Sequence, residues 1–166
     1  MDPQRRPAWS LFFKVECAAA AHSLSALSLM NSGPLTANEG TPESSLHEAA
    51  WAGDIAGAQK LLDHGADVNW ADSIGETALF GAVAWGHAEM VRFLLSHGAE
   101  FNLSEKNGYT PLHWAASHGN LATLQALLDA GANSNALDAL GRRPIDVARK
   151  HGKGEHVAHL KGRGAA

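Results

Sequence analysis

The sequence predicts an all-α repeat solenoid of four helix-turn-helix units joined by short β-hairpin-like turns. Glycines recur at one constant interval, at positions 65, 98 and 131, and other residue types keep the same period. No insertion or deletion interrupts this register from about residue 43 to the end of the chain. A fixed period of this length is typical of proteins that stack identical small units.

Five further sets of equivalent positions share the period, which makes a chance repetition of glycines an inadequate explanation. These sets are Gly53, Gly86, Gly119 and Gly152; Gly75, Gly108 and Gly141; Leu46, Leu79, Leu112 and Ile145; Leu61, Leu94, Leu127 and Leu160; and Asn69, Asn102 and Asn135. Each set therefore marks one position of the repeating unit.

The third unit shows how these residues predict a turn and two short helices. Asn107-Gly108 is a turn dipeptide, and Thr110 can cap a helix that has Pro111 as its first residue. Gly119 ends that helix, and Gly131 ends a second helix whose leucines are spaced to form one apolar face. Neither helix is long enough to be stable alone in water, so each must bury its apolar face against the next unit.

The residues of this third unit resemble an ankyrin repeat. The motif consists of Thr110-Pro111-Leu112-His113-Trp114-Ala115-Ala116, followed by Gly119, Leu127-Leu128 and Gly131-Ala132. The resemblance covers residues 43–166, with units at about 43–71, 72–104, 105–137 and 138–166.

The other units depart from the family pattern at a few positions. Unit two has Ala78 and Phe80 where proline and histidine are usual, and unit one lacks the leading glycine turn. Arg143 replaces the capping threonine of unit four, so we expect that helix to begin less firmly. The resemblance also implies that His47 and His113 form hydrogen bonds within and between repeats.

The resemblance implies a non-enzymatic protein–protein interaction module, acting as an adaptor or as an inhibitory or regulatory subunit. Ankyrin-repeat proteins usually meet a partner through a concave surface made of turn tips and first helices. The corresponding residues are Trp51, Ile74, Glu76, Trp85, Lys106, Asn107, Tyr109, His118, Leu140 and Arg142. Two interpretations of Trp51 and Trp85 stay open: they are exposed interface anchors, or their rings fold back onto the neighbouring unit.

The charge distribution suggests an alternative function. The formal net charge is only −4, but 12 acidic and 3 basic residues lie between positions 43 and 140, whereas 7 basic and 2 acidic residues lie between 142 and 166. This basic tip is either a solvated end cap or a surface that attracts an acidic partner. The alternative is therefore a nucleic-acid-linked regulatory protein that uses the basic C-terminal tip.

Motifs for catalysis are missing from the sequence, which has neither a Gly-x-Ser-x-Gly elbow nor a phosphate-binding Gly-x-x-x-x-Gly-Lys loop. Equivalent histidines of adjacent units should lie about 10 Å apart, too far to share one zinc ion. We therefore expect no catalytic residue, metal, cofactor or small-molecule substrate. The predicted partner is a protein rather than a nucleic acid, and the chain alone is predicted to be monomeric.

Residues 1–42 lack the period and predict a disordered or targeting extension. Their apolar stretch is interrupted by Lys14, Glu16 and His22, which argues against a membrane span and a typical signal peptide. Translation from Met30 is a third possibility. The single cysteine, Cys17, lies in this extension and cannot form a disulfide within one chain. We expect a cytoplasmic protein, with the nucleus or a destination set by this segment as alternatives.

Overall fold

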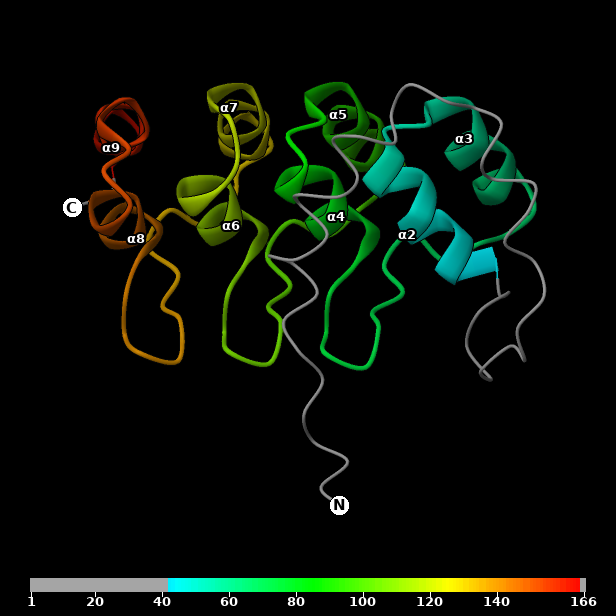
Figure 1. Ribbon diagram of the computed structural model, residues 1–166, viewed down its shortest axis with the longest axis horizontal. Coiled ribbons are helices and arrows are strands. Elements are labelled where there is room, and N and C mark those ends of the chain that lie inside the picture. Colours follow the sequence, from blue (N-terminus) through cyan, green and yellow to red (C-terminus); the bar gives the residue numbers. More distant parts are fainter. Residues whose placement is uncertain (1–41, 165–166) are drawn as a thin grey trace, which may run out of the picture. The chain divides into compact units, whose positions relative to one another are not determined.

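The computed structural model describes residues 42–164, which belong to one compact unit. The helices of this part of the chain are α2 (Pro42–Ala52), α3 (Ile55–Asp63), α4 (Ala78–Ala84), α5 (Ala88–Ser96), α6 (Pro111–Ser117), α7 (Leu121–Asp129), α8 (Pro144–Lys150) and α9 (Gly154–Gly162), labelled as in Figure 1. The predictions for residues 1–41 lie outside the described residues.

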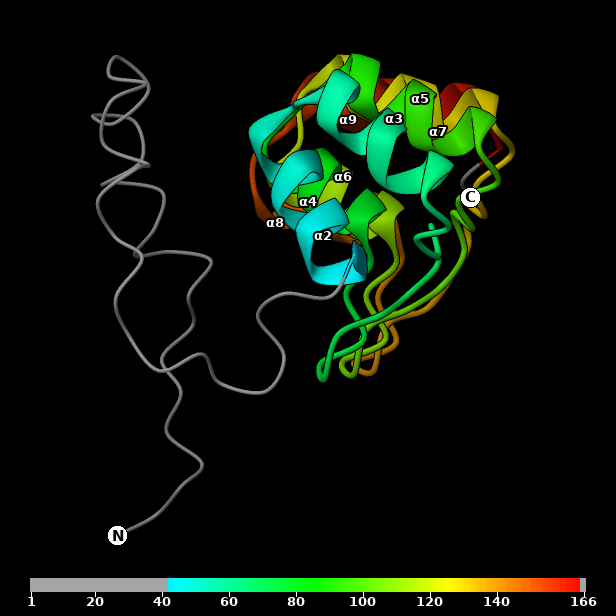
Figure 2. The same cartoon turned by 90° about the vertical axis from the view of Figure 1, so that its right-hand side faces the viewer.

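The helices form successive pairs in two rows, which confirms the predicted all-α repeat fold. Helices α2, α4, α6 and α8 form an inner row and pack against one another in sequence (Figure 1). The outer row consists of α3, α5, α7 and α9, with α7 packed between α5 and α9. Three loops, residues 64–77, 97–110 and 130–143, project from the helices and lie side by side (Figures 1 and 2).

Leucines of the repeat period pack in the core and glycines of that period end helices, as their residue types predict. Leu79, Leu112 and Ile145 are fully buried between helices of neighbouring pairs, and Leu46 is 1% exposed. Just beyond the outer helices, the glycines at 65, 98 and 131 adopt φ angles of 89°, 87° and 94°. This left-handed conformation strains other residue types, so glycine ends each outer helix and directs the chain into the loop.

A carboxylate closes each projecting loop from the same position of the repeat. Asp72 accepts hydrogen bonds from the backbone N–H groups of Ile74 and Glu76, and Asp138 makes the same pair of bonds two repeats later. Glu105, midway between them, accepts from the N–H of Tyr109 at 3.3 Å. Short side chains that bond nearby backbone groups favour tight turns, which explains these loops without regular strands.

Backbone hydrogen bonds also join neighbouring loops. The N–H of Lys106 donates to the carbonyl of Ile74 (3.0 Å), and the N–H of Ala139 donates to the carbonyl of Asn107 (2.9 Å). These two bonds connect equivalent atoms in successive repeats. The loop tips are therefore held in a fixed row rather than hanging independently.

Two histidines connect an inner helix to the loop of the next repeat. The Nε2–H of His47 donates to the carbonyl of Glu76 (2.9 Å), and that of His113 donates to the carbonyl of Arg142 (3.0 Å). The Nδ1 atom of His113 accepts from the N–H of Thr110 (3.2 Å), so the ring is held in one neutral tautomer. Burial lowers the pKa of His113. Phe80, the equivalent residue of the second pair, is buried and makes no such bond.

Helix α8 begins with a cap that the sequence analysis did not anticipate. The backbone N–H of Arg143 donates to Oδ2 of Asp146 (3.1 Å), and its Nε donates to the same atom (3.0 Å). Asp146 is the equivalent of His113 in the next repeat and takes over its role at the helix start. The expectation of a weak start at Arg143 was therefore wrong, because a carboxylate replaces the imidazole as acceptor.

Replacing His113 with phenylalanine, the side chain that the second pair already uses, tests the polar link between repeats. We expect His113→Phe to lower the free energy of unfolding by about 1–3 kcal/mol at pH 7, because the Thr110 N–H loses its acceptor and the Arg142 carbonyl keeps only the bond from the Asp138 N–H. Urea denaturation followed by circular dichroism measures the change.

The same variant should differ from wild type in its response to acid. Burial lowers the pKa of His113 in the folded state, so the unfolded chain takes up a proton at a higher pH than the folded protein does, and this residue costs stability as the pH falls. The difference in the free energy of unfolding between wild type and His113→Phe should therefore become smaller as the pH falls from 7 to 5. If this difference stayed constant with pH, the lowered pKa of His113 in the folded state would be contradicted.

Candidate interaction surface

The inner helices and the projecting loops meet at an angle, and we call the surface between them the concave face (Figure 2). Ring contacts show which side chains share it. Tyr109 in the second loop lies 6.3 Å from Trp114 on α6, measured between ring centroids. Trp114 lies 5.1 Å from His118, and His118 lies 5.2 Å from His151 at the end of α8. The expected separation of about 10 Å between equivalent histidines was wrong for this pair, because both side chains project from the ends of their helices toward each other. Aromatic rings therefore run continuously from the loop onto two inner helices.

Trp51 is exposed and at the same time packed against the neighbouring unit. Its side chain is 46% exposed. The edge of its ring also lies against α4 at Gly81, where an added Cβ would come within 1.9 Å of Trp51 Cδ1. Gly81 is the equivalent of Trp114, one repeat earlier. The indole of Trp51 thus fills space that the following repeat fills with its own tryptophan.

Trp85 is exposed at the end of an inner helix, although less so than Trp51. It follows α4 directly and is 36% exposed, and its equivalents in the next two repeats are His118 and His151, which are exposed as well. The ends of three inner helices therefore present ring side chains from the same position of the repeat.

The loop tips carry four of the predicted contact residues. Ile74 is 44% exposed and Leu140 is 74% exposed, while Lys106 and Asn107 are exposed polar residues between them in the row. Their backbones belong to the bonded row of tips, so the side chains project from fixed positions. Tips and helix ends are separate parts of the concave face.

Arg142 was predicted as a partner contact, but the structure already engages it within the protein. Its Nε donates to Asp138 (2.8 Å) and its Nη2 to the hydroxyl of Tyr109 (2.8 Å), with the guanidinium carbon 5.6 Å from the centre of the Tyr109 ring. Burial would raise the pKa of Asp138, but hydrogen bonds from Arg142 and Leu140 hold it below its usual value. Arg142 therefore holds Asp138 and Tyr109 in place, and its charge is already paired within the protein.

Glu76 occupies the same repeat position as Tyr109 and Arg142 but has a different environment. Its burial, followed by the charges of Asp72 and Glu105, raises the pKa of Glu76 to about 7. Within residues 42–164, no cationic side chain forms an ion pair with it. The concave face thus includes a carboxyl group that changes charge near neutral pH.

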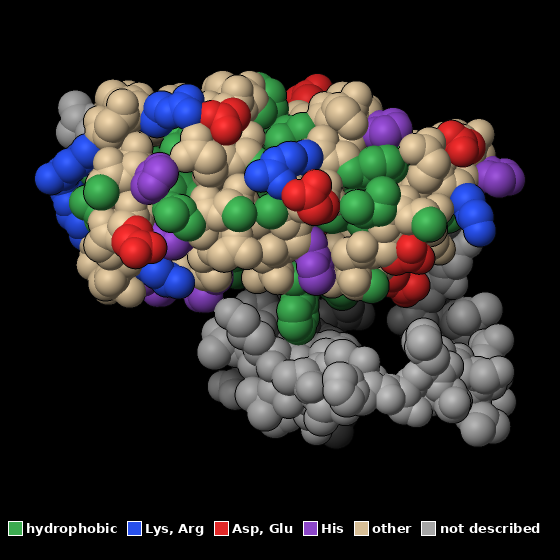
Figure 3. Space-filling model, turned by 90° about the horizontal axis from the view of Figure 1, so that it is seen from above, with side chains coloured by type: hydrophobic (Ala, Val, Ile, Leu, Met, Phe, Trp, Pro, Cys, Tyr) green, Lys and Arg blue, Asp and Glu red, His purple; other side chains and the backbone are tan. Residues whose placement is uncertain are grey.

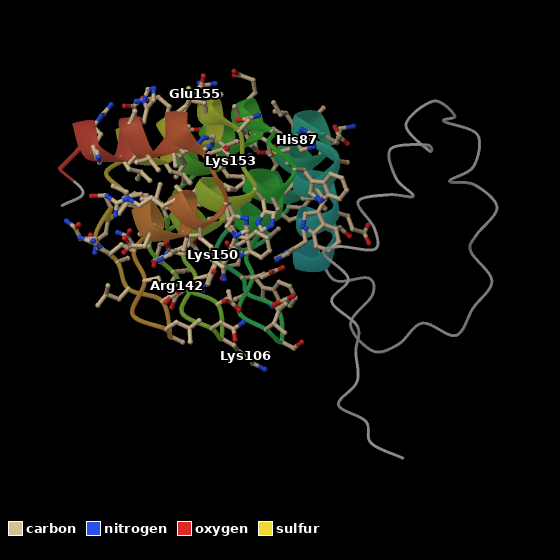
Figure 4. The ribbon with its side chains drawn as sticks, turned by 60° about the vertical axis from the view of Figure 1, so that its left-hand side comes forward. His87, Lys106, Arg142, Lys150, Lys153 and Glu155 are labelled. Carbon is tan, nitrogen blue, oxygen red and sulfur yellow. The ribbon has the colours of Figure 1, made fainter. Side chains whose placement is uncertain are left out.

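The basic end of the chain consists of two kinds of cation. Arg142, Arg143, Arg149 and Arg163 form ion pairs with Asp138, Asp146 and Asp129. Lys150 and Lys153 form none with the described acidic residues. Figure 3 shows Lys and Arg side chains gathered at the α8–α9 end, and Figure 4 shows Lys106, Arg142, Lys150 and Lys153 on one side of the stack.

A sequence model described as ankyrin repeats matches the chain in three overlapping stretches, residues 17–105, 46–138 and 98–165. This chain belongs to the ankyrin-repeat family. Ankyrin repeats are general protein–protein interaction modules, which agrees with a surface built from exposed rings on a fixed frame. No curated protein matches the sequence.

His156 has a structural contact within the stack, although its spacing from His159 is that of a weak metal-ligand pair. It is buried and bonds the carbonyl of Gly119 through Nε2 (3.2 Å). In the described part of the chain, His, Asp and Glu side chains form no group of three that could hold a metal ion. None of the described helices is both long and apolar enough to cross a membrane.

Two participants in the concave face were missed by sequence reasoning. Asp72 and Glu105 had no recognised role, yet they close the loops and determine the environment of Glu76. The available signal was that both stand at the repeat position that Asp138 occupies. Trp114 packs, partly buried, against the hydrophobic core and also contacts the rings of Tyr109 and His118.

The packing of Trp51 on Gly81 makes a prediction in which one substitution has opposite effects in two backgrounds. In wild type, Gly81→Ala should lower the free energy of unfolding by about 1–3 kcal/mol, because the new methyl group displaces the indole. In a Trp51→Ala background the same substitution should be stabilising by about 1 kcal/mol, since alanine favours a helix over glycine. Urea melts of the four proteins provide the test, and equal effects in both backgrounds would contradict this contact.

The environment of Glu76 predicts that removing its charge stabilises the protein. The raised pKa means that the folded state holds a proton more tightly than the unfolded state, so stability falls as the pH rises from 4.5 to 7. Because this carboxyl group also reaches solvent, we expect Glu76→Gln to gain about 1–2 kcal/mol at pH 8. The gain should shrink toward zero at pH 4.5. Glu100→Gln, which neutralises an exposed carboxylate elsewhere, should show no comparable gain.

Proposed function

We propose that this protein is an adaptor or regulatory subunit that captures a protein partner on its concave face. The observation that carries the proposal is the set of exposed rings at the ends of inner helices, with Trp51 and Trp85 foremost. Tryptophan is among the residues that most often dominate binding energy at protein interfaces. Charged and polar groups surround these rings, as they do at the rim of many interfaces.

The frame that presents these rings supports the proposal, because little of it would need to order on binding. The loop tips are bonded to one another, and each inner helix is packed against its neighbours. A surface that is already ordered loses less conformational entropy when a partner binds. Side chains from three repeats could then act together as one binding site.

The pairing of arginines weakens the alternative of a nucleic-acid-linked regulator. Phosphate recognition relies on Arg and Lys side chains that are available to the backbone of the nucleic acid. Each arginine from residue 142 onward is already paired with a carboxylate in the described chain. We therefore favour a protein partner, and a steep salt dependence of direct DNA or RNA binding would reverse that preference.

Affinity capture from the source cell tests the proposed function. The double variant Trp85→Ala, His118→Ala should lose most of the proteins that the wild-type chain captures, because both side chains lie on the concave face. Ile55→Ala is the matched control, since Ile55 is 37% exposed but begins α3 in the outer row. Both variants should keep the helical circular-dichroism signal. Equal capture by wild type and double variant would contradict this surface assignment.

A further inference from the structure

One repeat position changes its charge along the concave face. Equivalent loop residues are Glu76, Tyr109 and Arg142, so the column passes from an acid through a neutral ring to a base that is already paired. The residues at the ends of the inner helices change in the same direction along the stack, from the uncharged Trp51 and Trp85 to the basic Lys150 and His151. The concave face therefore has distinct ends.

The end formed by the first two loops has three carboxyl groups that form no ion pair within the described chain. Asp72 and Glu105 flank Glu76, and both raise its pKa by repulsion after burial has done so. Asp72 also bonds backbone N–H groups, which fixes its carboxylate beside Glu76. We call these three residues the acidic pole. By contrast, Asp138 in the third loop is neutralised by Arg142.

The opposite end is cationic. Lys150 ends α8, His151 follows it, and Lys153 precedes α9, with no acidic partner for either lysine in residues 42–164. Figure 4 shows Lys150 and Lys153 on the same side as Arg142 and Lys106. We call Lys150, His151 and Lys153 the basic pole. The aromatic row of Tyr109, Trp114 and His118 lies between the two poles.

We propose that the partner is a protein segment of opposed charge, with Lys or Arg at the acidic pole, apolar side chains along the aromatic row, and Asp or Glu at the basic pole. This inference rests on the proposed function and adds the partner's chemistry and its orientation. Complementary charges favour one register of binding, because the reverse placement brings like charges together.

The distance between the poles sets the length of such a segment. Packed helices lie 8–10 Å apart, so Glu76 and its equivalent Arg142, two repeats later, are separated by about 20 Å, and this is a lower bound for the distance from Glu76 to Lys150 at the far end of α8. An extended segment crosses this distance with about six residues at 3.3 Å each. A helical segment needs about 13 residues at 1.5 Å each.

Selection from a random peptide library tests the proposal while the partner is still unidentified. The probe is a displayed library of peptides of about 16 residues, long enough to join the poles even as a helix, selected on the full chain in low-salt buffer. We expect enriched peptides to carry basic residues at one end, acidic residues at the other and apolar residues between them.

Charge reversals at each pole then assign the ends. Glu76→Arg should weaken an enriched peptide about tenfold and restore affinity when the peptide's basic residues become acidic, because like charges would otherwise meet. Lys150→Glu should do the same for the acidic end. Glu100→Arg and Lys60→Glu are matched controls that make the same charge changes at exposed sites outside the concave face, and they should leave binding unchanged.

The outcomes separate this inference from the proposed function. Enriched peptides of one charge sign, or enriched peptides that ignore both reversals but are lost in Trp85→Ala, would overturn the opposed charges and leave the binding face in place. Enrichment that survives Trp85→Ala together with His118→Ala would overturn the proposed surface itself. Absence of any enrichment above an uncoated support would count against both.

Discussion

Contact between neighbouring helix pairs is the constraint on which this structure depends. The helices are 7 to 11 residues long, so none would persist in water without a neighbour to cover its apolar face. Leu79, Leu112 and Ile145 are buried because each repeat packs against the next. The strict register follows, since a single inserted residue would rotate these side chains out of the shared interface.

The same register lets side-chain chemistry vary where the stack does not need it to be constant. Residues 76, 109 and 142 have equivalent backbone positions, but they are a glutamate with a raised pKa, a tyrosine and an ion-paired arginine. The repeated backbone determines the position of each side chain, and the sequence determines its chemical type. A uniform scaffold can in this way display a surface with two different ends.

The sequence predicted the helices, the glycine stops and the buried leucines because these depend on local propensity and on the period. It also predicted that His47 and His113 would form hydrogen bonds. It could not show that Arg142 is engaged by Asp138 and Tyr109, since that contact depends on the side-chain geometry of two loops. The pKa of Glu76 was equally hidden, because burial and two carboxylates from different loops act on it together.

The fit of Trp51 on Gly81 has a consequence for how this array can change over time. A tandem copy of the second repeat would set Ala84, in place of the indole, above the new glycine and leave a void. Deletion of that repeat would bring Trp51 against Trp114, where two large rings would compete for one space. The repeats have similar backbones, but Trp51 and Gly81 fit each other only when the second repeat follows the first. The order of the repeats therefore cannot be changed freely.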